Sequence, residues 1–225
     1  RDKAAFRAGS VDSDQWDEAN RGDYSTAFGV NTTASGSSST VSGGRGNEAS
    51  SLNAVVSGGQ SNEASAANTT VGGGYDNTAD TIKATVGGGF ENTASGEAAV
   101  VSGGDNNDAT GDWSTVSGGN NNDATGDWST VSGGNNNAAT GDYTAIGGGG
   151  FNAIDNASSY SVIVGGGGAD AGTQNTIDNA STYSAIGGGT TNKIDNASTH
   201  SVIGGGEENT IDNASTYSAI GGGTT

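Results

Sequence analysis

A recurrence at every fifteenth position runs through most of the sequence and limits the folds open to it. The β-branched residue just before each glycine pair returns in seven consecutive steps of fifteen positions, and then at steps of 17, 23, 17 and 17. One step of 14 precedes the series. The positions are Ala27, Val41, Val56, Val71, Val86, Val101, Val116, Val131, Ile146, Ile163, Ile186, Ile203 and Ile220. Steps this short cannot hold a helix-containing repeat, and they suit a β-solenoid with two short strands per coil.

A second apolar series keeps register with the first. Its members are Ala34, Ala49, Ala64, Ala79, Ala94, Ala109, Ala124, Ala139, Ile154, Ile177, Ile194 and Ile211. Each coil therefore has two inward-pointing segments, and the paired glycines between them allow the positive φ that a tight corner demands. We expect an all-β chain, a parallel β-roll or β-solenoid of about twelve 14–17-residue coils with two short strands each.

Coil length and the size of the inward residue divide the chain. Residues 1–23 are expected to form a lead-in or cap, and 24–145 a β-roll of mainly 15-residue coils with inward Ala. Residues 146–225 are expected to form a wider roll of 17-residue coils, because a bulkier inward Ile needs more room. The step of 23 indicates an insertion of six residues near 167–173. The chain stops inside a repeat, so we interpret it as a fragment of a longer polypeptide.

Composition excludes several classes of protein. With 25 acids against 7 bases and a net charge of −18, the chain is not expected to bind nucleic acid. It has no Cys and no apolar run near the roughly 20 residues of a membrane span, so we expect no span in this fragment. Only 30% of residues are hydrophobic, and each coil buries few side chains. Parallel association would bury a second apolar surface, and we expect a homotrimer.

Asparagine stands two residues before the second inward position in eleven coils. These residues are Asn47, Asn62, Asn77, Asn92, Asn107, Asn122, Asn137, Asn152, Asn175, Asn192 and Asn209. Amides stacked in register can bond from coil to coil and satisfy the corner backbone, which predicts a structural Asn ladder.

A ring stands three residues before the first inward position in the later coils. The rings belong to Trp113, Trp128, Tyr143, Tyr160, Tyr183, His200 and Tyr217. Two interpretations are open. The rings pack on one another and cover an edge or a trimer seam, or they form an exposed ladder that binds a host or environmental glycan or surface.

Acids also recur in register. Asp112, Asp127 and Asp142 precede ladder rings, and Asp155, Asp178, Asp195 and Asp212 follow inward isoleucines. A solvated acidic face explains both rows of acids. Carboxylates in rows can also bind Ca²⁺, so the second row is a weak calcium candidate, and Ca²⁺ is the one possible cofactor. The sequons at Asn156, Asn179, Asn196 and Asn213 are candidate glycosylation sites, although Asn and Ser are also common corner residues.

No catalytic constellation is visible. The chain has one His and no Cys, and so thin a fold implies no buried pocket in which a triad or metal hydrolase could assemble. We therefore expect a protein that is not an enzyme.

The first coils resemble a known family. Tyr24-Ser-Thr-Ala-Phe-Gly-Val-Asn-Thr-Thr-Ala-Ser-Gly36, followed by Ser39-Thr-Val-Ser-Gly43, is similar to the head repeats of YadA-type trimeric autotransporter adhesins and related bacterial surface and tail-fibre proteins. The resemblance covers roughly residues 20–225. It implies a left-handed parallel β-roll, three chains side by side and an extracellular or cell-surface location. Most coils here are longer than the family's typical coil, and they carry two or three glycines where the family has one.

Three functions follow as hypotheses. The first is a structural fibre or adhesin rod whose adhesion, where present, uses its side-chain ladders. The second is a spacer or receptor-binding segment of a phage or contractile-injection tail fibre with the same fold. The third is an ice-binding solenoid, suggested by threonines in register at Thr40, Thr70, Thr85, Thr115 and Thr130 in a column interrupted by Val100, Ala145 and Val162.

Overall fold

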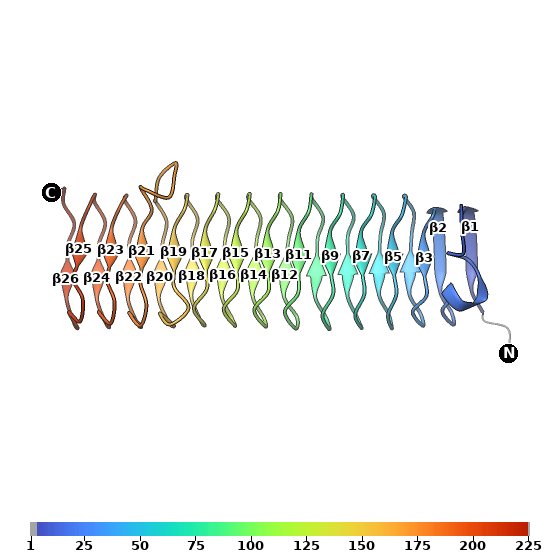
Figure 1. Ribbon diagram of the computed structural model, residues 1–225, viewed down its shortest axis with the longest axis horizontal. Coiled ribbons are helices and arrows are strands. Elements are labelled where there is room, and N and C mark those ends of the chain that lie inside the picture. The colour runs from blue at the N-terminus through green and yellow to red at the C-terminus, as the bar shows by residue number, and fades with distance from the viewer. Residues whose placement is uncertain (1–3, 225) are drawn as a thin grey trace. The chain divides into compact units, whose positions relative to one another are not determined.

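A computed structural model describes residues 4–224 and confirms the predicted fold class. The chain is an all-β parallel β-solenoid with two strands per coil, and strands β1 to β26 make about thirteen coils. Within the described range no α-helix occurs, and one 3-10 turn, η1, spans Glu18–Asn20. The chain divides into two compact units, Arg1–Asn106 and Asn107–Thr225. Figure 1 shows the stacked coils within each unit.

In the first unit, two sets of parallel strands face each other, one from sheet A and one from sheet B. The sheet A strands are β1 (Phe6–Ser10), β2 (Thr26–Val30), β4 (Thr40–Val41), β6 (Val55–Val56), β8 (Thr70–Val71), β10 (Thr85–Val86) and β12 (Val100–Val101). The sheet B strands are β3 (Thr33–Ala34), β5 (Glu48–Ala49), β7 (Glu63–Ala64), β9 (Thr78–Ala79) and β11 (Thr93–Ala94).

The second unit repeats the plan. Its sheet A strands are β14 (Thr115–Val116), β16 (Thr130–Val131), β18 (Ala145–Ile146), β20 (Val162–Ile163), β22 (Ala185–Ile186), β24 (Val202–Ile203) and β26 (Ala219–Ile220). Its sheet B strands are β13 (Asp108–Ala109), β15 (Asp123–Ala124), β17 (Ala138–Ala139), β19 (Ala153–Ile154), β21 (Thr176–Ile177), β23 (Lys193–Ile194) and β25 (Thr210–Ile211).

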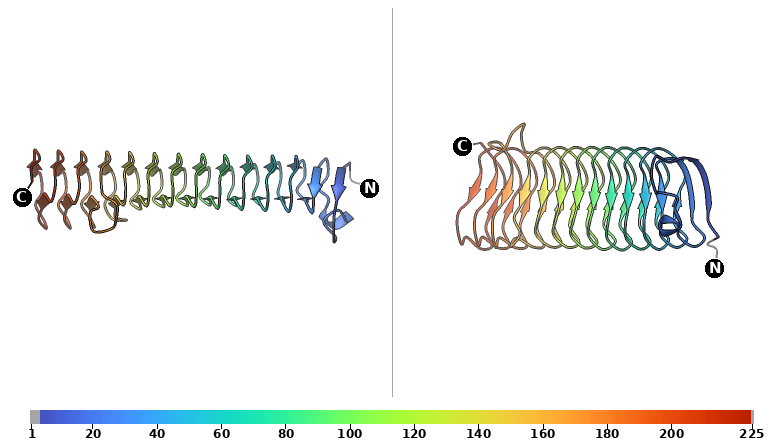
Figure 2. Two further views of the ribbon diagram at one scale, coloured as in Figure 1. Left: turned by 90° about the horizontal axis from the view of Figure 1, so that it is seen from above. Right: turned by 45° about the vertical axis from the view of Figure 1, so that its right-hand side comes forward.

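Each two-residue strand turns one side chain inward and one outward, because successive side chains of a strand point to opposite faces. The inward residues of sheets A and B meet between the two sheets, which lie on opposite sides of each coil (Figure 2). Within both units, every inward residue of these two series from Ala27 to Ile203 is fully buried. Strand pairing in strict register stacks equal residues on equal residues, so the core is a pair of apolar columns.

Larger core residues accompany longer coils in the second unit. Val131 pairs with Ile146, and Ala139 with Ile154, and from Ile146 to Ile163 the spacing of sheet A strands is two positions longer than before. The six extra residues form a loop that projects from the coil between β20 and β21 (Figure 1). Within it, Asp170 accepts hydrogen bonds from the amides of Gly172 and Thr173. The division of the chain at residue 145 stays a prediction.

The first coil differs from the others because arginine takes both inward positions. Arg7 pairs with Ala27, and Arg21 with Ala34, in the registers that carry Val and Ala elsewhere. The Arg7 guanidinium donates to the carbonyls of Ser25 (3.2 Å) and Ala34 (2.9 Å). Burial, and then the neighbouring Arg21 charge, lower the pKa of Arg7. Polar side chains thus take the place of apolar core residues in this coil, and the assignment of residues 1–23 as a lead-in or cap stays a prediction.

Candidate functional site

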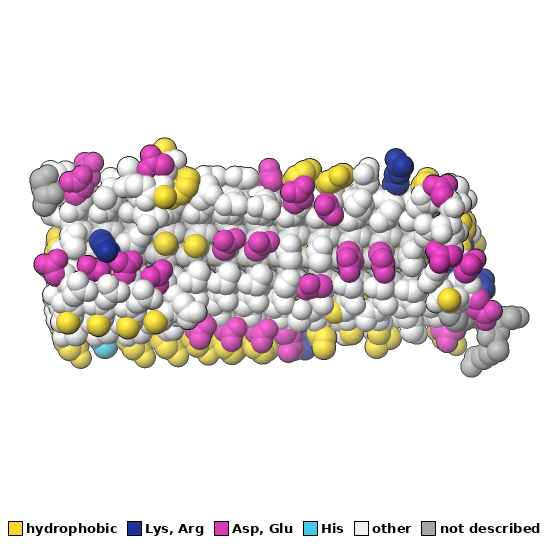
Figure 3. Space-filling model, in the orientation of Figure 1, with side chains coloured by type: hydrophobic (Ala, Val, Ile, Leu, Met, Phe, Trp, Pro, Cys, Tyr) yellow, Lys and Arg dark blue, Asp and Glu magenta, His cyan; other side chains and the backbone are white. Residues whose placement is uncertain are grey.

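An aromatic ladder runs along one edge of the second unit, at the corner that leads into each sheet A strand. Its seven rings are those of Trp113, Trp128, Tyr143, Tyr160, Tyr183, His200 and Tyr217. Neighbouring ring centroids lie 4.8–5.0 Å apart. The planes are within 4–8° of parallel from Trp113 to Tyr183 and 20–22° apart on either side of His200. Hydrophobic side chains form a line at this edge in Figure 3.

The ladder is also exposed, so it combines features of the two interpretations made from sequence. Trp128 is 44% exposed, Tyr183 54% and Tyr217 78%. Each inner ring has a neighbouring ring on either face, which leaves mainly its edge to solvent. A ligand at the middle of the ladder therefore meets a row of ring edges spaced at about one coil, and free ring faces are confined to the two ends.

All seven ladder residues adopt left-handed backbone conformation, with φ between 54° and 58°. The coil imposes this, because Asn53, Asn68, Lys83 and Ala98 occupy the same place in the first unit with φ of 56–65°. Bulky residues are costly there, by roughly 1–3 kcal/mol each, whereas Asn or Gly is tolerated. Ring stacking offsets part of that cost at about 0.5–1.5 kcal/mol per pair.

Two of the three acids beside the ladder, Asp127 and Asp142, stabilise the corners with their carboxylates. The Asp127 carboxylate accepts a hydrogen bond from the Asp112 amide (2.9 Å), and the Asp142 carboxylate accepts one from the Asp127 amide (3.0 Å). Each carboxylate thus caps the backbone of the preceding coil. Figure 3 shows acidic side chains next to the hydrophobic line.

The asparagines of the Asn ladder lie in register inside each unit. In the first unit, Asn62 Nδ2 donates to the carbonyls of Gly58 (3.0 Å) and Gly74 (2.9 Å), and its amide N–H donates to Asn47 Oδ1 (2.9 Å). Asn77 repeats these bonds one coil later. In the second unit the same contacts recur from Asn107 to Asn209. The column therefore bonds one coil to the next, and it shares corner carbonyls such as Gly74 O, which also accepts the Gln60 amide, with the backbone.

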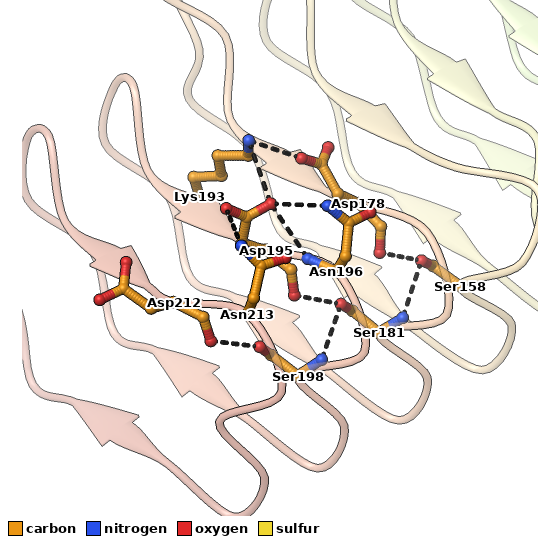
Figure 4. Close-up of polar contacts among 9 residues, drawn as sticks. All are labelled: Ser158, Asp178, Ser181, Lys193, Asp195, Asn196, Ser198, Asp212 and Asn213. Carbon is orange, nitrogen blue, oxygen red and sulfur yellow. Dashed lines mark hydrogen bonds and ion pairs between the residues drawn. The ribbon is translucent and has the colours of Figure 1, made fainter.

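The acid row considered for calcium is organised around the one lysine of the second unit. Lys193 Nζ lies 2.8 Å from Asp178 Oδ2 and 3.2 Å from Asp195 Oδ1 (Figure 4). The two hydrogen bonds raise the pKa of Lys193. Burial alone would raise the pKa of Asp195, but the Asn196 amide and the Lys193 ammonium together lower it. Among residues 4–224, no group of three or more His, Cys, Asp or Glu side chains is arranged to hold a metal ion.

The candidate glycosylation sites have exposed asparagines and hidden hydroxyls. Asn156, Asn179, Asn196 and Asn213 are all exposed. The sequon serines Ser158, Ser181 and Ser198 are buried. Ser181 Oγ donates to the Asp195 carbonyl (2.7 Å) and accepts from the Ser198 amide (3.2 Å), as Figure 4 shows. Glycosylation stays a prediction, and an enzyme that must contact the sequon hydroxyl would have to act before the coil forms.

A shallow groove of about 390 Å³ lies beside the inserted loop of the second unit. Its lining residues are Ala171, Gly172, Gln174, Thr176, Asp178, Thr191, Lys193 and Thr210. It is open and polar, and Lys193 is already paired with two carboxylates.

Acids also face outward from sheet B, where Asp108 and Asp123 stand side by side on paired strands. Burial, followed by the Asp108 charge, raises the pKa of Asp123 above 3.8. A raised folded-state pKa means that the ionised group destabilises the fold at neutral pH, and that the penalty disappears as pH falls through the folded pKa.

Asp123→Asn is therefore expected to stabilise the protein at pH 7, by less than about 1 kcal/mol because water screens a half-buried pair. The gain should vanish near pH 3, where the wild-type carboxyl is also neutral. Denaturation of both proteins at the two pH values measures this. An equal gain at both pH values would show that packing and not charge is responsible.

Comparison with known proteins does not indicate a function, so a functional proposal must be based on the fold and on the side-chain ladders. No protein-family model matches the chain, and no curated protein matches it significantly. Over residues 4–224, none of the helical structure has the length and apolarity needed to cross a membrane.

Sequence reasoning overlooked two features of the site. The ion pairs of Lys193 could have been predicted from its position in the repeat. Lys193 stands just before an inward Ile, as Asp108 and Asp123 stand just before an inward Ala, so its side chain points outward from sheet B beside the acid row. The left-handed backbone of the ladder had a signal in Asn53 and Asn68, since Asn is favoured in that conformation.

Proposed function

We propose that the chain is a segment of an extracellular structural fibre or adhesin rod and has no enzymatic activity. The supporting observation is the ladder of seven rings, each held in a backbone conformation that disfavours it. The same backbone conformation carries Asn53, Lys83 or Ala98 in the first unit, so the fold does not call for a ring at this position. The repeated rings are therefore proposed to act together at the surface, as the contact site for a glycan or an extended solid surface.

Self-association is the second part of the proposal. Each coil buries one inward residue per strand between its sheets, so a single chain has a narrow core. Parallel association of three chains would bury a further face along the coils. The resemblance of Tyr24–Gly36 to trimeric adhesin head repeats supports the same state and a left-handed roll.

The mass of the native protein tests self-association. Light scattering on residues 1–225 is expected to give three chains, at micromolar concentration and with or without a chelator. A stable single-chain mass would contradict a trimeric fibre segment.

The ladder is tested by shortening its stack. The double variant Trp128→Asn, Tyr143→Asn suits the left-handed backbone and removes two central rings. Its retention on a glycan array and on an alkyl-coated surface should fall roughly thirtyfold, since two ring contacts of about 1 kcal/mol each would be lost. Tyr75→Asn, which removes a stacked ring of the first unit, is the matched control. If the double variant were retained as well as wild type, the rings would only pack on one another and would not bind the ligand.

A further inference from the structure

The outer side of sheet A in the second unit forms a surface of its own kind. This sheet A face consists of the outward side chains on either side of each inward Val or Ile. They are Thr115, Ser117, Thr130, Ser132, Ala145, Gly147, Val162, Val164, Ala185, Gly187, Val202, Gly204, Ala219 and Gly221. All are small or β-branched and none is charged.

The outer side of sheet B is the opposite in character. At the equivalent positions it carries Asp108, Thr110, Asp123, Thr125, Ala138, Thr140, Ala153, Asp155, Thr176, Asp178, Lys193, Asp195, Thr210 and Asp212. The two faces belong to the same coils and have the same strand geometry. Their difference in charge therefore reflects what each face must contact and not what the fold requires.

We infer that the sheet A face of residues 107–225 is the surface that each copy turns toward the other copies of this chain in the proposed three-chain assembly. The inference rests on the proposed self-association and adds which surface carries it. The chain has a net charge of −18, so two copies repel one another wherever their acidic faces approach. The sheet A face is the broad side of the coil that a like-charged copy can approach without bringing carboxylates together.

Packing supports the same assignment. Val164 is 61% exposed and Val202 45% exposed, although both are apolar. Glycine or alanine at Gly147, Ala185 and Gly187 keeps the surface flat, so that another flat face can come close. Exposed valines on a sheet face without charged side chains favour a contact with another protein surface.

The direction of the contact follows from the gradient of polarity along the face. Hydroxyl side chains occupy its first coils, with Thr115 and Ser117 in one coil, whereas alanine, valine and glycine occupy the coils from Ala145 onward. Parallel, in-register docking places the apolar coils of one copy against the apolar coils of the other. Antiparallel docking would bury Val202 against hydroxyl groups. The copies therefore associate in parallel.

The absence of Cys from the chain allows a direct test, because any engineered thiol is unique. Val202→Cys lies on the sheet A face, and Thr210→Cys, at the equivalent exposed position of the next strand, lies on sheet B. Under mild oxidation of the full chain, Val202→Cys should form disulfide-linked dimers and Thr210→Cys should not. In a mixture, Thr115→Cys and Val202→Cys should each link to themselves and not to one another.

A charge on the face should abolish docking without unfolding the chain. Val164→Asp with Val202→Asp should reduce the mass to one chain while the circular dichroism spectrum is retained, and Thr210→Asp should leave the mass unchanged.

The opposing results are distinct. Cross-linking through Thr210→Cys alone, in a protein of several chains, would overturn the sheet A assignment and leave self-association standing. A wild-type protein of one chain would overturn both. If the wild-type protein were a single chain with thermal hysteresis, and the Val164→Asp, Val202→Asp variant lost that hysteresis, the sheet A face would instead be an ice-binding surface.

Discussion

Gly44→Ala is expected to destabilise its coil strongly, although it adds a single methyl group. A Cβ at this position would lie 2.0 Å from the carbonyl oxygen of Gly59 and 2.5 Å from Asn47 Nδ2. Neither atom can move freely, because Gly59 O accepts the Arg45 amide (3.0 Å) and Asn47 Nδ2 donates to Gly43 O (2.8 Å). The backbone φ of +89° is itself unfavourable for alanine.

The expected loss is roughly 3 kcal/mol or more, because a backbone clash adds to the conformational strain. Solenoids lose structure locally, since each repeat contacts only its neighbours. Hydrogen exchange should therefore show faster opening of the coils next to residue 44 within the first unit, together with a lower midpoint in chemical denaturation.

The neighbouring residue supplies the control. A Cβ on Gly43 would meet nothing within 4 Å, and its φ lies outside the left-handed range. Gly43→Ala should change stability by no more than about 0.5 kcal/mol. Equal exchange rates in the two variants would mean that the coils are not held at this corner by close backbone contact.

The sequence determines the fold so well because each coil has one simple requirement. One apolar residue per strand must point inward, and parallel stacking repeats that requirement at a fixed spacing. The spacing alone therefore locates the buried positions, such as Val86 and Ala94, and the two-residue strands that carry them. The glycine pairs recur at the same spacing, so they locate the corners.

For the surface, the sequence predicts only which residues stack in register from coil to coil, such as rings on rings and acids on acids. It does not predict which atoms each surface side chain contacts, because those contacts depend on the backbone geometry of the corners. The left-handed backbone turns Trp128 onto Trp113, and the Asp127 carboxylate reaches the Asp112 amide of the preceding coil. Lys193 reaches both Asp178 and Asp195, because one lies in the preceding coil and the other two residues along its own.

Asn137→Ala is expected to destabilise the second unit strongly, as an example of the repeated asparagines of the Asn ladder. Asn137 Nδ2 donates to the carbonyls of Gly133 (3.1 Å) and Gly149 (3.1 Å), and its Oδ1 accepts the amide of Asn152 (3.0 Å). Alanine would remove these bonds in a fully buried position. Gly149 O keeps the Asn135 amide, but Gly133 O loses the Asn137 donor and the Asn152 amide loses its acceptor. At about 1–3 kcal/mol for each of these two groups, we expect a loss of roughly 3 kcal/mol.

Asn135→Ala is the matched control, two residues earlier in the same corner. Asn135 is exposed, and its Nδ2 donates to Asn120 Oδ1 (2.7 Å) in contact with water. Its removal should cost no more than about 0.5 kcal/mol. Both variants are compared by chemical denaturation and by hydrogen exchange of the coils on either side of residue 137.

Asn137→Asp distinguishes lost hydrogen bonds from an empty cavity, because it keeps the shape of asparagine. A carboxylate there would face the carbonyls of Gly133 and Gly149 without a proton to donate, so burial and these oxygens should raise its pKa. The variant should then be less stable than Asn137→Ala at pH 7 and should recover as pH falls through that raised pKa, where a protonated oxygen can donate again. If Asn137→Asp instead matched wild type at pH 7, the asparagine column would be filling space and would not be bonding one coil to the next.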